Sequence, residues 1–114
     1  MTTLVLPAAE QSALAPLEIW EVMFDDSTIK FFEPLLIEPK ILDRGTSGEC
    51  YFAECPEIGI SAVGIDIEEL SSCLRSDIRM TWRRIVRKRD NNLTPNDRAM
   101  KRRWLEIAEE VNDE

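Results

Sequence analysis

The 114-residue sequence contains no histidine, only three cysteines and only four glycines. Without histidine, the chain lacks Ser-His and Cys-His nucleophile pairs, the commonest zinc ligand and the side chain that most readily titrates near neutral pH. Cys50, Cys55 and Cys73 form no Cys-x-x-Cys pair, which fits small reduced thiols better than a zinc site or a disulfide framework. We therefore expect no catalytic residue, no metal, no cofactor and no small-molecule substrate, and we expect a protein that is not an enzyme.

Long apolar runs are also missing. No stretch approaches the roughly 20 apolar residues of a membrane span, and Gly45 and Gly48 lack the lysine and helix that follow a phosphate-binding loop. Residues 1–16 are rich in Ala and Pro, with no basic region at their start. We expect a loosely ordered segment over residues 1–16, a single domain over residues 17–114, a cytoplasmic location and no contact with a membrane.

Charge is abundant but unevenly distributed. The formal net charge is −8, from 14 basic and 22 acidic residues. Residues 1–64 carry this whole excess, whereas residues 75–103 hold all 11 bases of the second half with only three acids, a local charge of +8. The acidic total argues against general affinity for nucleic acid, but the basic stretch needs a separate explanation.

The first half of the chain predicts strands. Residues 17–24 are rich in Trp, Val, Ile and Phe, and Asp25-Asp26-Ser27 is a turn signal before a second strand at 28–32. Two prolines, Pro34 and Pro39, place the run between them at a sheet edge or bend. A Gly/Ser turn at 44–48 then precedes predicted strands at 49–55 and 60–63.

The second half predicts two helices. Asp66 followed three residues later by Glu69 is typical of a helix start, and apolar residues then recur every three or four positions over a helix at 67–90. Thr94 and Pro95 begin a second helix at 95–111. The sequence therefore predicts an α+β fold, with one antiparallel sheet of four or five strands covered on one face by two C-terminal helices. Trp20, Trp82 and Trp104 are predicted to be core residues.

The stretch from Gly48 to Leu74 resembles the HicB-like antitoxin domain. The resemblance rests on a Tyr/Phe-containing strand at 49–55, Pro56-Glu57-Ile58, a Ser-containing strand ending at Gly64, and the capped Glu68-Glu69 helix start. It implies a small sheet with a packed helix, similar to a truncated ribonuclease-H-like fold. It also implies a binding role, typically neutralisation of a small toxic ribonuclease. This sequence adds a predicted hairpin before the matching region, and a single predicted helix follows it.

Four arginines, Arg75, Arg79, Arg83 and Arg87, follow one another at uniform steps of four. On a helix they share one face, where like charges cost about 0.2–0.5 kcal/mol per neighbouring pair, so we expect something acidic opposite them. Three interpretations remain open: acids of the chain itself, including Glu106, Glu109 and Glu110; the acidic surface of a partner or of a second copy; and a phosphate backbone.

The run Leu35-Leu36-Ile37 is the second candidate binding feature, because an edge strand can offer unpaired backbone groups to a partner. Acidic clusters at 54–57 and 66–69 have simpler roles at a bend and a helix start, which leaves metal-dependent nuclease activity as a minor alternative. We therefore predict a non-enzymatic protein-binding module. It would use Leu35, Leu36, Ile37 and the four arginines, with nucleic-acid binding through the arginine face as the alternative.

Overall fold

The structure is a computed structural model that describes residues 15–43 and 49–112. The predicted turn at 44–48 and residues 1–14 of the predicted N-terminal segment lie outside these ranges. The strands are β1 (Leu17–Phe24), β2 (Ser27–Ile37), β3 (Lys40–Asp43), β4 (Glu49–Cys55), β5 (Ile60–Gly64) and β6 (Ala108–Asn112). The α-helices are α2 (Ile67–Thr81) and α3 (Pro95–Ile107), and short 3-10 turns span Pro56–Ile58 and Asp90–Asn92.

The α+β class is confirmed, but the single sheet of four or five strands is wrong. The described strands form two three-stranded antiparallel sheets, ordered β1-β2-β6 and β3-β4-β5. The division falls at Glu38 and Pro39, which separate β2 from β3. Proline lacks the N–H that a continuous ladder would need, so the chain leaves one sheet and enters the other at this point.

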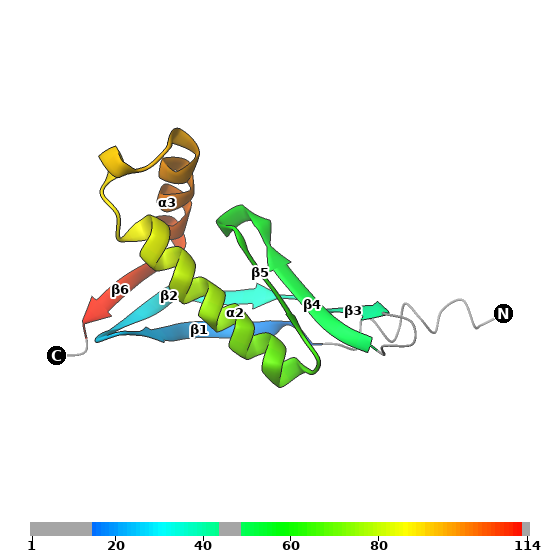
Figure 1. Ribbon diagram of the computed structural model, residues 1–114. Helices are drawn as coiled ribbons and strands as arrows, with labels where there is room; N and C mark the ends of the chain where they lie inside the picture. The colour runs from blue at the N-terminus through cyan, green and yellow to red at the C-terminus, as the bar shows by residue number, and fades with distance from the viewer. Residues whose placement is uncertain (1–14, 44–48, 113–114) are drawn as a thin grey trace.

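The predicted second helix is too long. The α-helix ends at Ile107, and Ala108–Asn112 forms β6, which pairs with residues 27–31 of β2 (Figure 1). The predicted 67–90 helix is also shorter: α2 ends at Thr81, and Trp82–Val86 continue as a π-helical turn closed by a hydrogen bond from Arg87 N to Trp82 O (3.0 Å).

Both predicted helix starts are confirmed. The Asp66 carboxylate accepts a hydrogen bond from Glu69 N (2.7 Å), and the Thr94 hydroxyl accepts one from Asp97 N (3.1 Å). The Glu69 side chain accepts from Ile65 N (2.8 Å), one residue before the cap. These contacts satisfy backbone donors that a helix leaves unpaired in its first turn.

The core joins both sheets and both helices. The predicted apolar residues of α2 and the turn after it are all buried: Leu70, Leu74, Ile78, Trp82 and Ile85. In Figure 1, α2 runs diagonally past β1 and alongside β5, the strands that it contacts most. The indole rings of Trp82 and Trp104 meet edge to face with centroids 5.8 Å apart, which fixes the turn after α2 against α3.

Candidate functional site

The arginine row lies beside the free edge of β1. In the β1–β2 hairpin, Phe24 pairs with Ser27 across the two-residue turn, so the backbone groups of Met23 and Glu21 point away from β2. Arg75 Nη1 donates to Glu21 O (2.9 Å), and Arg79 Nη1 donates to Met23 O (3.4 Å). These arginines therefore cover carbonyl groups that an edge strand would otherwise expose.

The spacing of the row matches the strand. Four residues of α-helix rise about 6.0 Å, and two residues of a strand advance about 6.6–6.8 Å. Successive arginines can thus meet every second residue of β1, as Arg75 and Arg79 do. The next member, Arg83, reaches Asp25 in the turn, with Nη2 3.4 Å from Oδ1.

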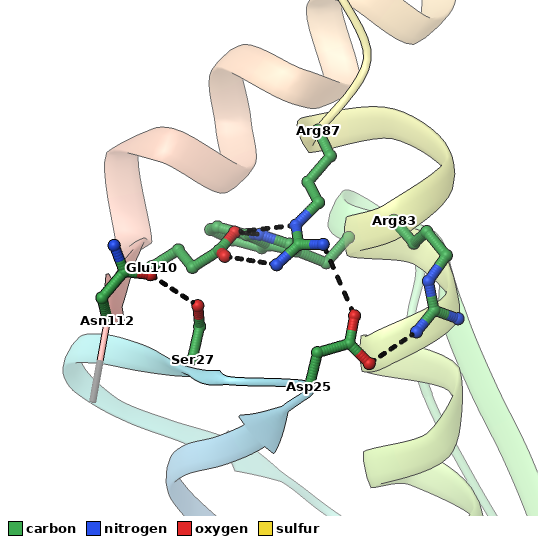
Figure 2. Close-up of polar contacts among 7 residues, drawn as sticks. Asp25, Ser27, Arg83, Arg87, Glu110 and Asn112 are labelled. Atoms are coloured by element: carbon green, nitrogen blue, oxygen red, sulfur yellow. Dashed lines mark hydrogen bonds and ion pairs between the residues drawn. The ribbon is translucent and has the colours of Figure 1, made fainter. Parts of the chain in front are cut away.

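Arg87 completes the row in a network shown in Figure 2. Its guanidinium donates two hydrogen bonds to the Glu110 carboxylate, from Nε (3.2 Å) and Nη2 (2.5 Å), and its Nη1 lies 3.5 Å from Asp25 Oδ2. Trp82 Nε1 also donates to Glu110 Oε1 (2.8 Å). The Phe24 ring lies under Arg87, whose guanidinium carbon is 4.2 Å from the ring centroid.

This environment changes the acidity of Glu110. The hydrogen bonds from Arg87 lower the pKa of Glu110 to about 2, assisted by donors from Trp82 and Ser27 and opposed by partial burial. The same pairing raises the pKa of Arg87. Of the acids expected opposite the arginines, Glu110 makes direct contact, while Asp25 and two backbone carbonyls complete the set.

The predicted run Leu35-Leu36-Ile37 lies in β2, which is the central strand of its sheet. Residues 35–37 pair with residues 17–19 of β1, whereas β6 covers β2 only from Ser27 to Phe31. Beyond Phe31, no other described strand pairs with β2 on the side of β6. Residues 32–37 therefore have an edge that lacks a described strand, although β2 as a whole is not an edge strand.

A groove follows this part of β2. One cavity of about 320 Å³ and a second of about 480 Å³ share Leu35, Leu36, Glu106 and Ile107. The groove thus lies between β2 and the C-terminal end of α3, and its second cavity extends to the Pro56–Ile58 turn. Ile37 contributes to the groove but is only 3% exposed.

Strands β1 and β2 also carry exposed apolar side chains. Trp20 is 56% exposed and Phe32 is 55% exposed, and Leu36, which lines the groove, is 59% exposed. The prediction that Trp20 belongs to the core is therefore wrong, whereas Trp82 and Trp104 are buried as predicted. Trp20 lies at the irregularity in the β1–β2 register, between Ile19 and Glu21, and its indole donates to Glu18 Oε1 (2.8 Å). Phe32 and Leu36 both line the first cavity, and exposed apolar side chains beside a groove are typical of an interaction surface.

A second charged region includes the segment before α3 and one residue within α3. Arg84, Lys88, Arg89 and Arg102 are exposed and form no salt bridge within the described residues. By contrast, the Lys101 ammonium pairs with Asp90 (2.9 Å) and the Arg98 guanidinium donates to Leu93 O (2.9 Å). The predicted row is a different set of residues, and each of its arginines makes a hydrogen bond or an ion pair within the chain.

The carboxylates and the three cysteines do not form a second candidate site in the described residues. Among residues 15–43 and 49–112, no three Cys, Asp or Glu side chains are grouped so that they could hold a metal ion. Cys50 is buried, Cys55 is half-buried and Cys73 is exposed. Burial and the neighbouring Glu57 carboxylate raise the pKa of Cys55, which makes this thiol less reactive.

None of the helices in the described part of the chain has the length and hydropathy needed to cross a membrane. Comparisons of the chain with protein-family models, with curated proteins and with solved structures found no match. The resemblance to HicB-like antitoxins over residues 48–74 therefore stays a prediction.

Sequence reasoning missed the α3 side of the groove. The sequence predicts one helix over 95–111, so it gives no sign that the helix ends at Ile107 and that Arg103, Glu106 and Ile107 line a groove beside β2. One feature of the sequence indicates that Trp20 could be exposed: apolar residues occur on both faces of the predicted strand at 17–24. A strand with apolar groups on both faces must either be covered twice or present one face to a partner.

Proposed function

We propose that this chain is a non-enzymatic protein-binding module whose partner occupies the groove along β2 and the exposed apolar residues beside it. The observation that carries the proposal is the stretch of β2 beyond Phe31, where a backbone edge without a described strand borders the groove. Such an edge supplies hydrogen bonds and the adjacent pockets supply selectivity, which is a common way to bind an extended protein segment.

The arginine row has a different place in this proposal. Arg75, Arg79, Arg83 and Arg87 make contacts within the chain, so their main task is to cover β1 and join the turn after α2 to β6. A partner that also touches them would do so at the parts of the guanidinium groups that these contacts leave exposed.

Affinity capture followed by nuclease treatment tests the proposal. Leu36 and Met80 are both 59% exposed, but only Leu36 lines the groove, so Leu36→Lys and Met80→Lys form a matched pair. We expect the same captured protein with the wild type and Met80→Lys, and its loss with Leu36→Lys. Release of the captured protein by nuclease, or equal capture by all three chains, would contradict the proposal.

The resemblance to HicB-like antitoxins suggests one kind of partner, a small toxic ribonuclease. If that interpretation is right, the captured protein should degrade RNA when it is purified alone, and addition of this chain should suppress the degradation. A captured protein without ribonuclease activity would exclude the antitoxin role and leave the binding proposal intact.

A second candidate function, nucleic-acid binding, is favoured by the exposed bases near the start of α3. Arg84→Glu with Arg89→Glu should abolish binding to duplex DNA or RNA if this region holds phosphates, and wild-type affinity should fall steeply with salt. Arg79→Glu with Arg83→Glu tests the predicted row in the same assay. If the wild-type chain does not bind duplex DNA or RNA even at low salt, nucleic-acid binding is excluded as its function.

A further inference from the structure

The groove along β2 has an apolar floor and an acidic rim. Its apolar part includes Leu35, Leu36, Ile58 and Ile107. Around this floor stand five glutamates: Glu33, Glu38, Glu54, Glu57 and Glu106. The combination suits lysine and arginine, whose aliphatic stems lie along apolar surface while their charged ends reach an acidic rim.

The negative charge of the rim is not balanced locally. None of the five glutamates forms a salt bridge within the described residues. Arg103 is the single base that lines the described groove, and its guanidinium lies 3.4 Å from Glu57 O as a hydrogen-bond donor. A base brought by a partner would therefore gain from several carboxylates at once, whereas a phosphate would be repelled.

The shape of the site favours an extended segment over a helix. The six residues 32–37 of β2 span about 20 Å at the usual rise of a strand. On the side of β6 they have no described strand partner. An added strand would lie along this length, and its successive side chains would point to opposite faces of the sheet, where residues of both faces of β2 line the groove.

A second copy of this chain does not offer such a segment from its described residues. Its bases are concentrated at 75–103, which forms helices and turns, and its described strands carry only Lys30 and Lys40. Lys30 pairs across strands with Glu21 and Glu109 in the ladders on either side of β2. The charge complementarity therefore points to a different protein as the occupant.

On the basis of the proposed function, we infer that the groove binds an extended, basic segment of a partner protein, with alternating apolar and lysine or arginine side chains, along residues 32–37 of β2. The apolar side chains meet Leu35, Leu36 and Ile107, and the basic ones meet the glutamate rim.

Labelled peptides of alternating Lys and Val, and of alternating Glu and Val, are suitable probes. We expect the Lys-Val peptide to bind by fluorescence polarisation and to shift the backbone amide signals of residues 32, 33 and 35–37 in the NMR spectrum of the full chain, while the Glu-Val peptide does neither. Pro34 has no amide proton and gives no signal. Glu54→Gln with Glu106→Gln should weaken binding about tenfold at low salt, the effect of removing two partly exposed ion pairs.

The control variant, Glu68→Gln with Glu109→Gln, removes the same charge from exposed positions outside the groove. Equal weakening by both variants would show attraction to net charge alone and would overturn the inference. So would amide shifts confined to other parts of the chain, or absence of binding by the Lys-Val peptide. A self-associated chain that excludes the peptide would likewise overturn it, and sedimentation of the free protein would reveal that state.

The inference and the proposed function can fail separately. If a captured protein is lost with Leu36→Lys but retained by Glu54→Gln with Glu106→Gln, the module binds protein without the basic segment. If no protein is captured by the wild type, the proposed function itself fails. Loss of the captured protein in the groove variant, with retention in the control variant, would support both.

Discussion

Arg75 donates a hydrogen bond to the carbonyl oxygen of Glu21, 54 residues earlier in the chain, at a distance of 2.9 Å. The contact joins a helix face to the edge of a sheet through a charged side chain and a neutral backbone group. Its neighbour Arg79 repeats the arrangement one helical turn later, at Met23 O. An open strand edge is a template for unwanted pairing between chains, so these two arginines protect β1 as well as hold α2 in place.

Replacement of both arginines by alanine should uncover that edge. For Arg75→Ala with Arg79→Ala, we expect a loss of about 1–2 kcal/mol in the free energy of unfolding, the usual value of two exposed hydrogen bonds to charged donors. We also expect concentration-dependent association on mild heating. Urea denaturation and light scattering measure the two effects, and Arg84→Ala, which changes an exposed arginine without a salt bridge in the described structure, is the control. If Arg84→Ala associates to the same extent, the association of the double variant results from the loss of positive charge and not from the uncovered edge of β1.

The Glu110 network should make stability depend on acid pH. Because the folded state holds the pKa of Glu110 at about 2, below its usual value of 4.5, the contribution is fully present above pH 4.5. It is lost as the pH falls from 4.5 toward 2. We expect a contribution on the order of 1–2 kcal/mol after allowance for the partial exposure of Arg87.

Denaturation of the wild type and of Glu110→Gln across this pH range measures that contribution. The difference between them should shrink as the pH falls, since the protonated wild-type carboxyl then resembles the amide. Glu109→Gln changes the neighbouring exposed carboxylate and should keep the wild-type profile. A constant difference between wild type and Glu110→Gln from pH 7 to pH 2 would contradict the assigned network.

Gly64 ends β5 where the chain passes close to the first turn of α2. A Cβ atom at Gly64 would lie 2.5 Å from Leu70 N and 2.9 Å from Leu70 Cα, and backbone cannot move aside as a flexible side chain can. Gly64→Ala should therefore destabilise the fold by about 3 kcal/mol. Gly59→Ala is a useful comparison because its cost, about 1 kcal/mol, arises from the positive φ of 74°. Thermal unfolding of both variants should rank Gly64→Ala as the more harmful, and the opposite ranking would place the helix start further from β5.

The fluorescence of the three tryptophans should differ in its sensitivity to a quencher dissolved in the solvent. Trp20 is 56% exposed, while Trp82 and Trp104 are at most 1% exposed. Acrylamide should quench one component of the fluorescence readily and leave the rest nearly unaffected, and Trp20→Phe should remove the quenchable component. If quenching persists unchanged in Trp20→Phe, one of the two core indoles must be accessible.

Local patterns in the sequence predicted the features that depend on neighbouring residues. The caps at Asp66 and Thr94 and the buried stripe from Leu70 to Ile85 follow from spacing alone, and the structure confirms them. The strand β6 could not be predicted in this way, because Ile107, Ala108 and Val111 also fit a helical period. Its strand character arises from pairing with β2, where Ser27 meets a residue 85 positions away.

The candidate site shows the same division. The regular steps of the arginine row indicate that hydrogen-bond acceptors lie opposite it. Two of these acceptors are backbone carbonyls, which every residue has, so the sequence cannot show which residues supply them. The prolines that flank the run at 35–37 predict an edge or a bend there, but they give no sign of a groove. The groove beside it depends on where α3 ends, and that point is set by the pairing of β6.

The two charged regions lie at opposite ends of α3. Arg98 belongs to its first half, with Arg84, Lys88 and Arg89 on the segment before it, while Glu106 lies near its end, beside the rest of the acidic rim. Thirteen helical residues separate these ends by about 20 Å, so the exposed bases before α3 and the acidic rim face a partner from separate places on the surface. In water at low ionic strength, a basic partner would therefore be rotated toward the groove before any atoms touch. The speed of association would fall with added salt, even where the lifetime of the complex did not change.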